Sequence, residues 1–487
     1  MKTIIRGLVL ALGATSALAE EPLTKLTIRP ARAPVPALKY RLTPSPREQI
    51  SGNAAVFHHR ALLMVNETRA AQAGGERKGD FDQRLQEWLN GPITSIPREE
   101  AAKALAPYGS ALREVELGTR RRSCDWEFDQ RDEAFELLLP EVQATRSLAR
   151  LIVLKVRLAT LAGETDEALH WLQVGLTLGR QVGQGPILIQ DLVGFAITSQ
   201  HLLTLEHLIQ APETPSLYWA LANRPRPWID LGPAFEGERQ ALEKTLPALR
   251  ELDGPPWSVE KARIVADDFQ MRIGRLTDVP WLRSNEEAAG KGVPSFNEIR
   301  PRLTLATMAA KVYPEARRAL IGEGRSVAQV DAMPIFQAAL WNAYRKHIRL
   351  NDDMYKWLGV PYAQSFNRLD EAFPRDMDTK TADPLFMVFL SLSPALNSVR
   401  VAEVRMERML DAYQIVEALR LYAADHEGKL PPNLEALTDS PAPLDPATGK
   451  PFAYQVEGNV ATLSAPTIPG GPEHPAFRVR CVIQMAK

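Results

Sequence analysis

The stretch from Leu138 to Ile209 constrains the fold more than any other, because it is the most apolar long segment beyond the first 19 residues. Apolar residues recur at the spacing of a buried helix face, as at Leu148, Leu151 and Ile152. Glycine at 163 then ends the first periodic run. We predict three consecutive helices that form the core of a large, mainly α-helical domain.

Small residues follow one face of the second predicted helix. Ala168, Leu172, Gly175 and Gly179 lie at i, i+4, i+7 and i+11. Each interior glycine costs up to about 1 kcal/mol in helix propensity, so packing has to outweigh that cost. We therefore expect a neighbouring helix to approach closely along this face.

The third predicted helix is too short and too polar to span a membrane. Pro186 suits a first turn, where its missing N–H costs little. Between Ile187 and Leu205 the single charged residue is Asp191. A carboxylate in such an apolar helix needs a buried partner, and an arginine of the first core helix is the expected one.

The string LAGETDEALHWLQVGLTLGR resembles the helix–turn–helix of a tetratricopeptide repeat, with Gly163, Ala168, Leu172 and Gly175 at the small and apolar positions. The resemblance covers about one repeat, and no second copy follows at a period of roughly 34 residues. Two interpretations stay open. The segment is either a helical hairpin in an irregular α domain or part of a degenerate repeat array.

Residues 1–19 have the pattern of a secretory signal peptide. Lys2 and Arg6 precede an apolar run, and residues 17–19 read Ala-Leu-Ala. We expect cleavage after Ala19 and a periplasmic or extracellular location. The formal net charge of −1 would become −3, and this near-neutral balance argues against nucleic acid as a partner.

The chain divides into three further parts by composition. Residues 20–46 are rich in proline and predict an extended segment lying over the body. Residues 47–396 predict an irregular α-helical domain, and residues 397–487 a small α+β module. No transmembrane span is expected after the signal peptide.

A charged and aromatic cluster precedes the core helices. Asp125, Trp126 and Asp129 could form an interaction site, whereas helix capping and surface ion pairing explain the same residues without one. Cys124 and Cys481 are the two cysteines, and in an oxidising compartment they could form a disulfide, although 357 positions separate them in the sequence. Two buried free thiols are the alternative.

Aromatic and proline residues gather in the segment SLYWALANRPRPWIDL. Tyr218, Trp219 and Trp228 surround Pro225 and Pro227. We predict a fixed bend between two helical layers. An exposed aromatic shelf for a peptide or sugar is the alternative.

The C-terminal module resembles the globular end of type II secretion pseudopilins of the G kind. A long helix leads to a YxxDHxGxxP-like turn, then to a short helix and to DPxTGxPFxY before a small antiparallel sheet. The matching residues are Tyr422, Asp425, His426, Gly428, Pro431, Asp445, Pro446, Gly449, Pro451, Phe452 and Tyr454. No prepilin leader precedes this helix, so the resemblance implies a borrowed fold.

The same resemblance implies a calcium ligand at Asp445, because some pseudopilins bind calcium near the DP loop. Few acidic residues surround Asp445 in the sequence. The simpler interpretation is a turn stabilised by the Asp445 side chain and fixed by Pro446.

Most of the chain also resembles a family of large secreted planctomycete proteins that carry a pseudopilin-like tail. The residues that match are Cys124, Asp125 and Trp126, LLLPEVQATRSLARL, GQGPILIQDLVGFAI and LYWALANRPRPWIDL. This resemblance implies a fold and an exported location, and it implies no activity.

Residue patterns of common chemistries are missing from the sequence, which has no HExxH, GxSxG, Walker or GxGxxG motif. We therefore expect an exported protein that is non-enzymatic and serves as an interaction or scaffold protein with a protein partner in the cell envelope. One alternative is a secreted hydrolase whose acidic site is assembled from distant residues. Another is a calcium-stabilised envelope component.

Overall fold

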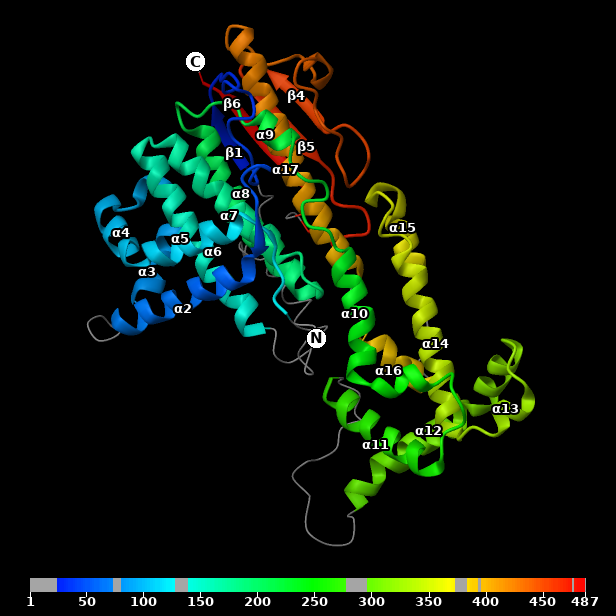
Figure 1. Ribbon diagram of the computed structural model, residues 1–487. Coiled ribbons are helices and arrows are strands. Elements are labelled where there is room, and N and C mark those ends of the chain that lie inside the picture. The colour runs from blue at the N-terminus through cyan, green and yellow to red at the C-terminus, as the bar shows by residue number, and fades with distance from the viewer. Residues whose placement is uncertain are drawn as a thin grey trace.

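The computed structural model describes residues 24–72, 80–127, 139–276, 296–372, 383–392, 396–474 and 477–486. The fold is mainly helical with a small sheet, which confirms the predicted class (Figure 1). The signal-peptide pattern lies outside the described residues.

The N-terminal body is a group of helices that includes the three core helices. Its elements are β2 (Ile50–Asn53), α2 (Ala54–Gln72), α3 (Asp80–Asn90), η1 (Ile93–Ser95), α4 (Arg98–Leu105), η2 (Ala106–Tyr108), α5 (Gly109–Thr119), β3 (Arg121–Ser123), α6 (Leu139–Ala162), α7 (Thr165–Val182), α8 (Leu188–Gln210) and α9 (Tyr218–Ala222). Strands β2 and β3 pair in parallel.

The three predicted core helices are α6, α7 and α8, which pack against one another. Gly163 ends α6 with a φ of 75°, a conformation that glycine adopts at no steric cost. Pro186 lies two residues before α8 rather than in its first turn. The close approach predicted along α7 is confirmed, because a Cβ on Gly175 would lie 1.9 Å from the Nε2 of His201 on α8.

A second helical lobe follows the body. It contains α10 (Gly232–Thr245), η4 (Pro247–Glu251), α11 (Val259–Leu276), α12 (Phe296–Gly322), α13 (Val327–Asp331), α14 (Ile335–Tyr355), α15 (Tyr362–Ala372) and α16 (Pro384–Leu392). In Figure 1 these green and yellow helices extend away from the body. They have a hydrophobic core of their own, in which Trp257, Phe269 and Phe389 are buried.

The C-terminal part contains α17 (Leu396–Asp425), η6 (Leu434–Ala436), β4 (Ala453–Glu457), β5 (Val460–Ala465) and β6 (Val479–Met485). Strands β4, β5 and β6 are antiparallel neighbours, as predicted for a small antiparallel sheet. The proline-rich segment adds a strand, β1 (Thr24–Ile28), which pairs in parallel with β6 from Thr24 opposite Cys481 to Ile28 opposite Met485.

The hydrophobic cores join parts of the chain that are distant in the sequence. One continuous core joins the body to α17 and the four-stranded sheet, and it contains Leu205, Leu410 and Ile483. A second core holds residues of α10 to α14 and of α16, whereas Phe235 of α10 belongs to the first core. Tyr362 of α15 packs with Val401 of α17 in a third, small cluster. Helix α17 packs on α8 and α9, so the C-terminal module completes the N-terminal body.

One stretch, Pro384–Asp425, is long and apolar enough to cross a membrane by length and composition alone, and its most apolar window has a mean hydropathy of 1.5. Residues 393–395 within it lie outside the described residues. The most apolar window is 71% buried inside the protein. Core helices have the same property, so this stretch is weak evidence for a membrane span.

Candidate functional site

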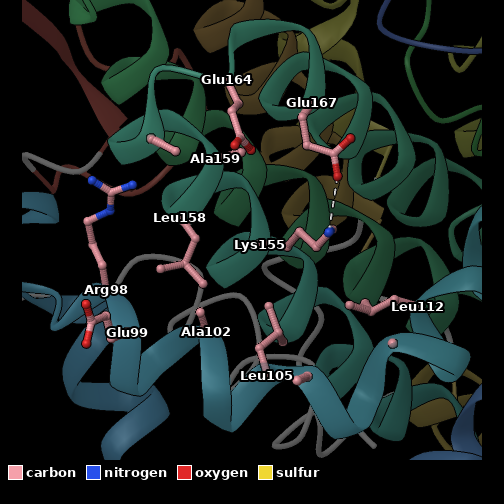
Figure 2. A pocket seen from close by; sticks show the side chains of 13 residues that line it. Arg98, Glu99, Ala102, Leu105, Leu112, Lys155, Leu158, Ala159, Glu164 and Glu167 are labelled. Carbon is pink, nitrogen blue, oxygen red and sulfur yellow. Dashed lines mark ion pairs between the residues drawn. The ribbon is translucent and has the colours of Figure 1, made fainter.

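A groove crosses the surface of the N-terminal body where α4, η2 and α5 face α6 and the start of α7 (Figure 2). Its volume is about 660 Å³. Small and aliphatic side chains line the floor from both sides, namely Ala102, Leu105, Ala106, Gly109, Leu112, Leu158, Ala159 and Ala162. This is a grooved apolar surface between helices.

The rim of the groove is charged. Arg98 and Glu99 border it at the start of α4, and Glu164 lies at the start of α7. On the opposite side of the groove, Lys155 of α6 forms an ion pair of 3.1 Å with Glu167 of α7. An apolar floor with a charged rim is the arrangement expected of a protein-binding surface.

The Glu167 carboxylate is held by its neighbours. Burial raises its pKa, but hydrogen bonds from the Trp171 indole, at 2.8 Å, and from Lys155 outweigh that effect and lower the pKa overall. The Lys155 ammonium also lies 5.1 Å from the centre of the Trp171 ring. The rim charge at this position is therefore fixed in place.

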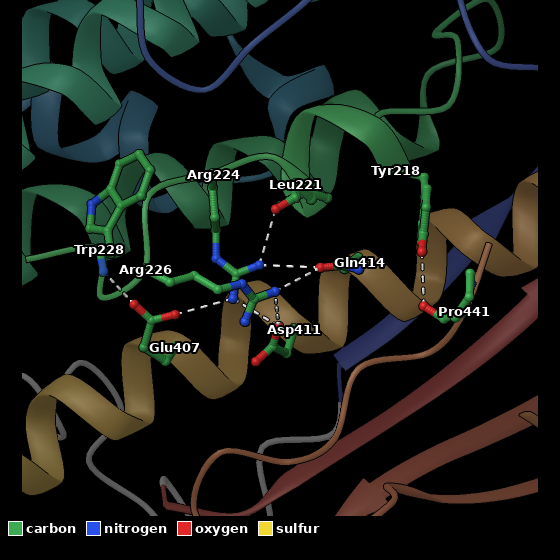
Figure 3. A network of polar contacts seen from close by, with 9 residues as sticks. All are labelled: Tyr218, Leu221, Arg224, Arg226, Trp228, Glu407, Asp411, Gln414 and Pro441. Atoms are coloured by element: carbon green, nitrogen blue, oxygen red, sulfur yellow. Dashed lines mark hydrogen bonds and ion pairs between the residues drawn. The ribbon is translucent and has the colours of Figure 1, made fainter. Parts of the chain in front are cut away.

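The segment with aromatic and proline residues is bound to α17 by buried charges (Figure 3). Arg224 donates to Glu407 at 3.1 Å and to Asp411 at 2.8 Å, and its side chain is fully buried. Arg226 donates to the same Asp411 oxygen at 3.0 Å. Trp228 is fully buried.

These contacts confirm the predicted fixed bend. Tyr218 is buried as well, and its hydroxyl donates to the carbonyl of Pro441 at 2.9 Å. The alternative of an exposed aromatic shelf is wrong for Tyr218 and Trp228, because both side chains are used to dock the segment.

Asp191 of α8 is fully buried, and neither of its carboxylate oxygens has a hydrogen-bond donor among the described residues. The prediction of an arginine partner from the first core helix is wrong. The buried arginine of that helix, Arg157, donates instead to the carbonyls of Trp88 and Gly91. Those carbonyls end α3, so Arg157 satisfies a helix C-terminus.

The groups that face Asp191 are also acidic. They are Glu403 of α17, Glu238 of α10 and Asp230, which precedes α10. Burial, followed by the charges of Glu403, Glu238 and Asp230, raises the pKa of Asp191 well above its usual range. Burial also raises the pKa of Glu238 and of Glu403 to about 7 in each case.

The acidic cluster of Asp191, Glu238 and Glu403 has few neutralising partners. Glu403 accepts a hydrogen bond of 2.6 Å from Arg400, and Glu238 accepts one of 3.3 Å from the backbone N–H of Leu188. Among the described residues, no group of three or more acidic, histidine or cysteine side chains is placed to hold a metal ion.

The predicted calcium residue, Asp445, is paired with an arginine. Its Oδ1 accepts from Arg408 Nε at 2.8 Å and from the Ala447 N–H at 3.0 Å. Its Oδ2 accepts from Arg408 Nη2 at 2.7 Å and from the Thr448 hydroxyl at 2.8 Å. Protein donors thus occupy both oxygens. The geometry agrees with the simpler interpretation of Asp445 as the residue that stabilises the turn.

The residues of the predicted interaction cluster have structural contacts. Trp126 is buried, and its ring lies 4.9 Å from that of His59. Asp125 accepts from the N–H of Glu127 at 2.8 Å, and its own backbone pairs with the Asn53 side chain. Asp129 lies outside the described residues. Asp125 and Trp126 therefore anchor the chain after β3 to β2 and α2, respectively.

The predicted disulfide is not formed, since both cysteines are free. Cys481 points from β6 into the core, where burial raises the pKa of its thiol to about 12. Cys124 follows β3, and burial raises the pKa of its thiol too. The alternative of two free thiols agrees with the structure.

Sequence reasoning missed Glu238 and Glu403 as partners of Asp191, and it missed Arg408 as the partner of Asp445. One signal was present for α17. Glu403, Glu407, Asp411 and Gln414 recur at three- and four-residue spacing and so share one helix face, which a solvated helix also shows. In the structure that face is buried, which distinguishes α17 from a solvated helix with the same pattern.

Comparison of the chain with protein-family models, with curated proteins and with solved structures finds no match in any of the three.

Proposed function

We propose that this chain is an exported, non-enzymatic interaction protein whose groove between α4–α5 and α6–α7 binds an amphipathic helix of a protein partner. The observation that carries this proposal is the apolar floor between two layers of helices. An amphipathic helix binds by laying its apolar face into such a groove.

The floor suits a helix because its residues are small. Ala102, Ala106 and Gly109 line one side of the floor, and Ala159 and Ala162 line the other side. Small side chains allow two helix axes to approach within the 8–10 Å of ordinary helix packing. Leu105 and Leu158 supply apolar contact area within the same groove.

The location and the finer architecture belong to the same proposal. The signal-peptide pattern of residues 1–19 supports export, so the partner would lie in the cell envelope. The α6–α7 hairpin is proposed to be a single tetratricopeptide-like unit. Helix α17 followed by β4, β5 and β6 supports a pseudopilin-like origin for the C-terminal module.

Gly109 allows the groove to be filled without disturbing the fold. A Cβ at this position would meet no atom within 4 Å, and the backbone φ of −56° suits any residue. Gly322 at the end of α12 also has open space around a Cβ. Gly109→Phe therefore blocks the groove, and Gly322→Phe is its matched control in the second lobe.

The test is a display library of helical peptides selected on the full chain. We expect enriched peptides with apolar residues at i, i+3 and i+4 whose affinity falls at least about tenfold on Gly109→Phe, the effect of losing about 1.4 kcal/mol. Gly322→Phe is expected to leave the affinity unchanged. Peptides whose affinity is unchanged by Gly109→Phe, or a selection that enriches no peptide, would refute the proposal.

A second candidate function, an acid–base hydrolase, is favoured by the acidic cluster. Glu238 and Glu403 come from distant parts of the chain, and a pKa of about 7 suits a general acid at neutral pH. The test is hydrolysis of an oligosaccharide panel between about pH 4 and 8. Activity that disappears in both Glu238→Gln and Glu403→Gln supports this function, and activity unaffected by both contradicts it.

A further inference from the structure

A second concave surface lies on the outer face of the C-terminal sheet, opposite the side that packs on the core. It has a volume of about 630 Å³, within the range of ligand-binding pockets. We refer to it as the outer trough. Polar and charged side chains line it, among them Lys450, Gln455, Thr462, Ser464, Arg478 and Arg480.

The charge of the outer trough has one sign. Lys450, Arg478 and Arg480 are the charged residues among the described ones that line it, and all three are exposed. Two guanidinium groups and an ammonium favour a ligand that carries carboxylates, which arginine pairs with in a bidentate geometry.

Hydrogen-bonding side chains lie between these charges in register. Gln455 of β4 stands opposite Thr462 of β5, and Ser464 of β5 stands opposite Arg480 of β6. The alternate residue Leu463 is buried in the core, so Thr462 and Ser464 share the outer face. They are two residues apart on a strand, a separation of roughly 6.4–6.8 Å.

The walls of the outer trough are held by one buried arginine. Besides its pair with Asp445, Arg408 donates to the carbonyl of Pro466 at 2.6 Å and to that of Phe477 at 3.1 Å. Pro466 lines the trough, and Phe477 directly precedes Arg478, which also lines it. Arg408 therefore ties the ends of β5 and β6 to the turn that starts at Asp445.

The same turn places the lysine. The Asp445 N–H donates to the carbonyl of Lys450 at 2.9 Å, and the Thr448 hydroxyl accepts from the Lys450 N–H at 3.3 Å. The backbone that carries the Lys450 ammonium is thus fixed before any ligand binds. A backbone that is already fixed at this position lowers part of the ordering cost of binding.

We propose that the outer trough binds an acidic segment of a partner protein in an extended conformation. An extended segment has side chains on one face every two residues, which is the spacing of Thr462 and Ser464 along β5. Its carboxylates meet the three cations, while its main chain meets the hydroxyl and amide groups between them. This site is independent of the groove in the N-terminal body.

The test measures binding of a fluorescent hexa-aspartate peptide to the full chain, with hexalysine and polygalacturonate as comparison probes. The variants are the double substitution Lys450→Gln with Arg480→Gln and the matched control Lys429→Gln. Lys429 is exposed in the same module and pairs with Glu427, away from the trough.

We expect hexa-aspartate to bind, hexalysine not to bind, and the double variant to weaken the affinity at least about tenfold, the effect of losing one or more charge-assisted hydrogen bonds. Lys429→Gln should stay within about twofold, and added salt should weaken binding through screening. Gly109→Phe should leave this binding unchanged, which separates the outer trough from the groove.

Three results would overturn the proposal. The first is no binding of hexa-aspartate at low salt. The second is equal binding by the wild type and the double variant, which places the peptide elsewhere. The third is binding of polygalacturonate alone, which assigns the trough to a polysaccharide instead of a protein segment.

Discussion

At the scale of single residues, the pair of Arg408 and Asp445 is the most consequential buried contact of the C-terminal module. Both side chains are 1% exposed, and their two hydrogen bonds measure 2.8 and 2.7 Å. Removing one member of such a pair leaves the other charge buried without its partner.

We expect Asp445→Ala to lower the free energy of unfolding by about 3–5 kcal/mol. Chemical denaturation of the full chain measures the change. We also expect calcium or a chelator to leave the stability of the wild type unchanged, because protein donors occupy both Asp445 oxygens. A calcium-dependent increase that Asp445→Ala abolishes would restore the calcium hypothesis.

Gly175 permits the contact between α7 and α8. A Cβ there would lie 1.9 Å from Nε2 and 2.1 Å from Cδ2 of the buried His201 ring, so Gly175→Ala forces the His201 ring, or the helix that carries it, to shift. We expect a loss of about 1–3 kcal/mol from this overpacking. Gly322→Ala, with open space, is the control and should not destabilise the chain. Equal stability of the two variants in denaturation would contradict the close contact.

At the scale of elements, α8, α10 and α17 meet at the acidic cluster. The charges of Glu238, Glu403 and Asp230 all act on Asp191 there, and Arg400 pairs with Glu403. Folding raises the pKa of each of the three carboxyls. The folded state therefore holds their protons more tightly than the unfolded state does.

The sign of the pH dependence follows from these raised values. The stabilisation from proton binding is fully present below the unfolded pKa of about 4 and is lost as pH rises to about 7, the folded pKa of Glu238 and Glu403. We expect Glu238→Gln to stabilise the chain by about 1–2 kcal/mol at pH 8 and much less at pH 4.

Glu236→Gln, on an exposed position of the same helix, is the matched control and should show no such pH dependence. Urea unfolding at the two pH values measures all three proteins. If the wild type and Glu238→Gln differ equally at pH 4 and pH 8, the carboxylate of Glu238 is not the titrating group.

At the scale of the whole molecule, the two large hydrophobic cores predict two unfolding units. The first core joins the body to α17 and the sheet, and the second holds α10 to α14 with α16. Separate cores in one chain commonly unfold in separate steps.

We expect differential scanning calorimetry to show two transitions. Leu340→Ala, in the second core, should lower the midpoint temperature of one transition, and Leu205→Ala, in the first core, should lower that of the other. Each substitution should reduce the unfolding free energy of its unit by about 2–5 kcal/mol. Truncation of β1 should affect the transition that Leu205→Ala shifts, because β1 pairs with β6. A single transition shifted by both substitutions would refute two units.

Local patterns were sufficient to predict much of the secondary structure. The helix face through Leu148, Leu151 and Ile152, the stop at Gly163 and the small residues at Gly175 and Gly179 all appear as expected. These features depend on the 3.6-residue period and on backbone conformations that are properties of neighbouring residues. The sequence by itself therefore determined the helical class, the core helices and the turn at Asp445.

Tertiary structure alone decided which distant residues meet. The pairing of β1 with β6, the contact of Arg408 with Asp445 and the gathering of Asp191, Glu238 and Glu403 join segments separated by tens to hundreds of positions. A charged helix face has the same periodicity whether it is solvated or buried, as the stripe along α17 shows. Only packing removes the water, and that removal selects each charge's partner and raises the pKa of the buried carboxyls of Asp191, Glu238 and Glu403.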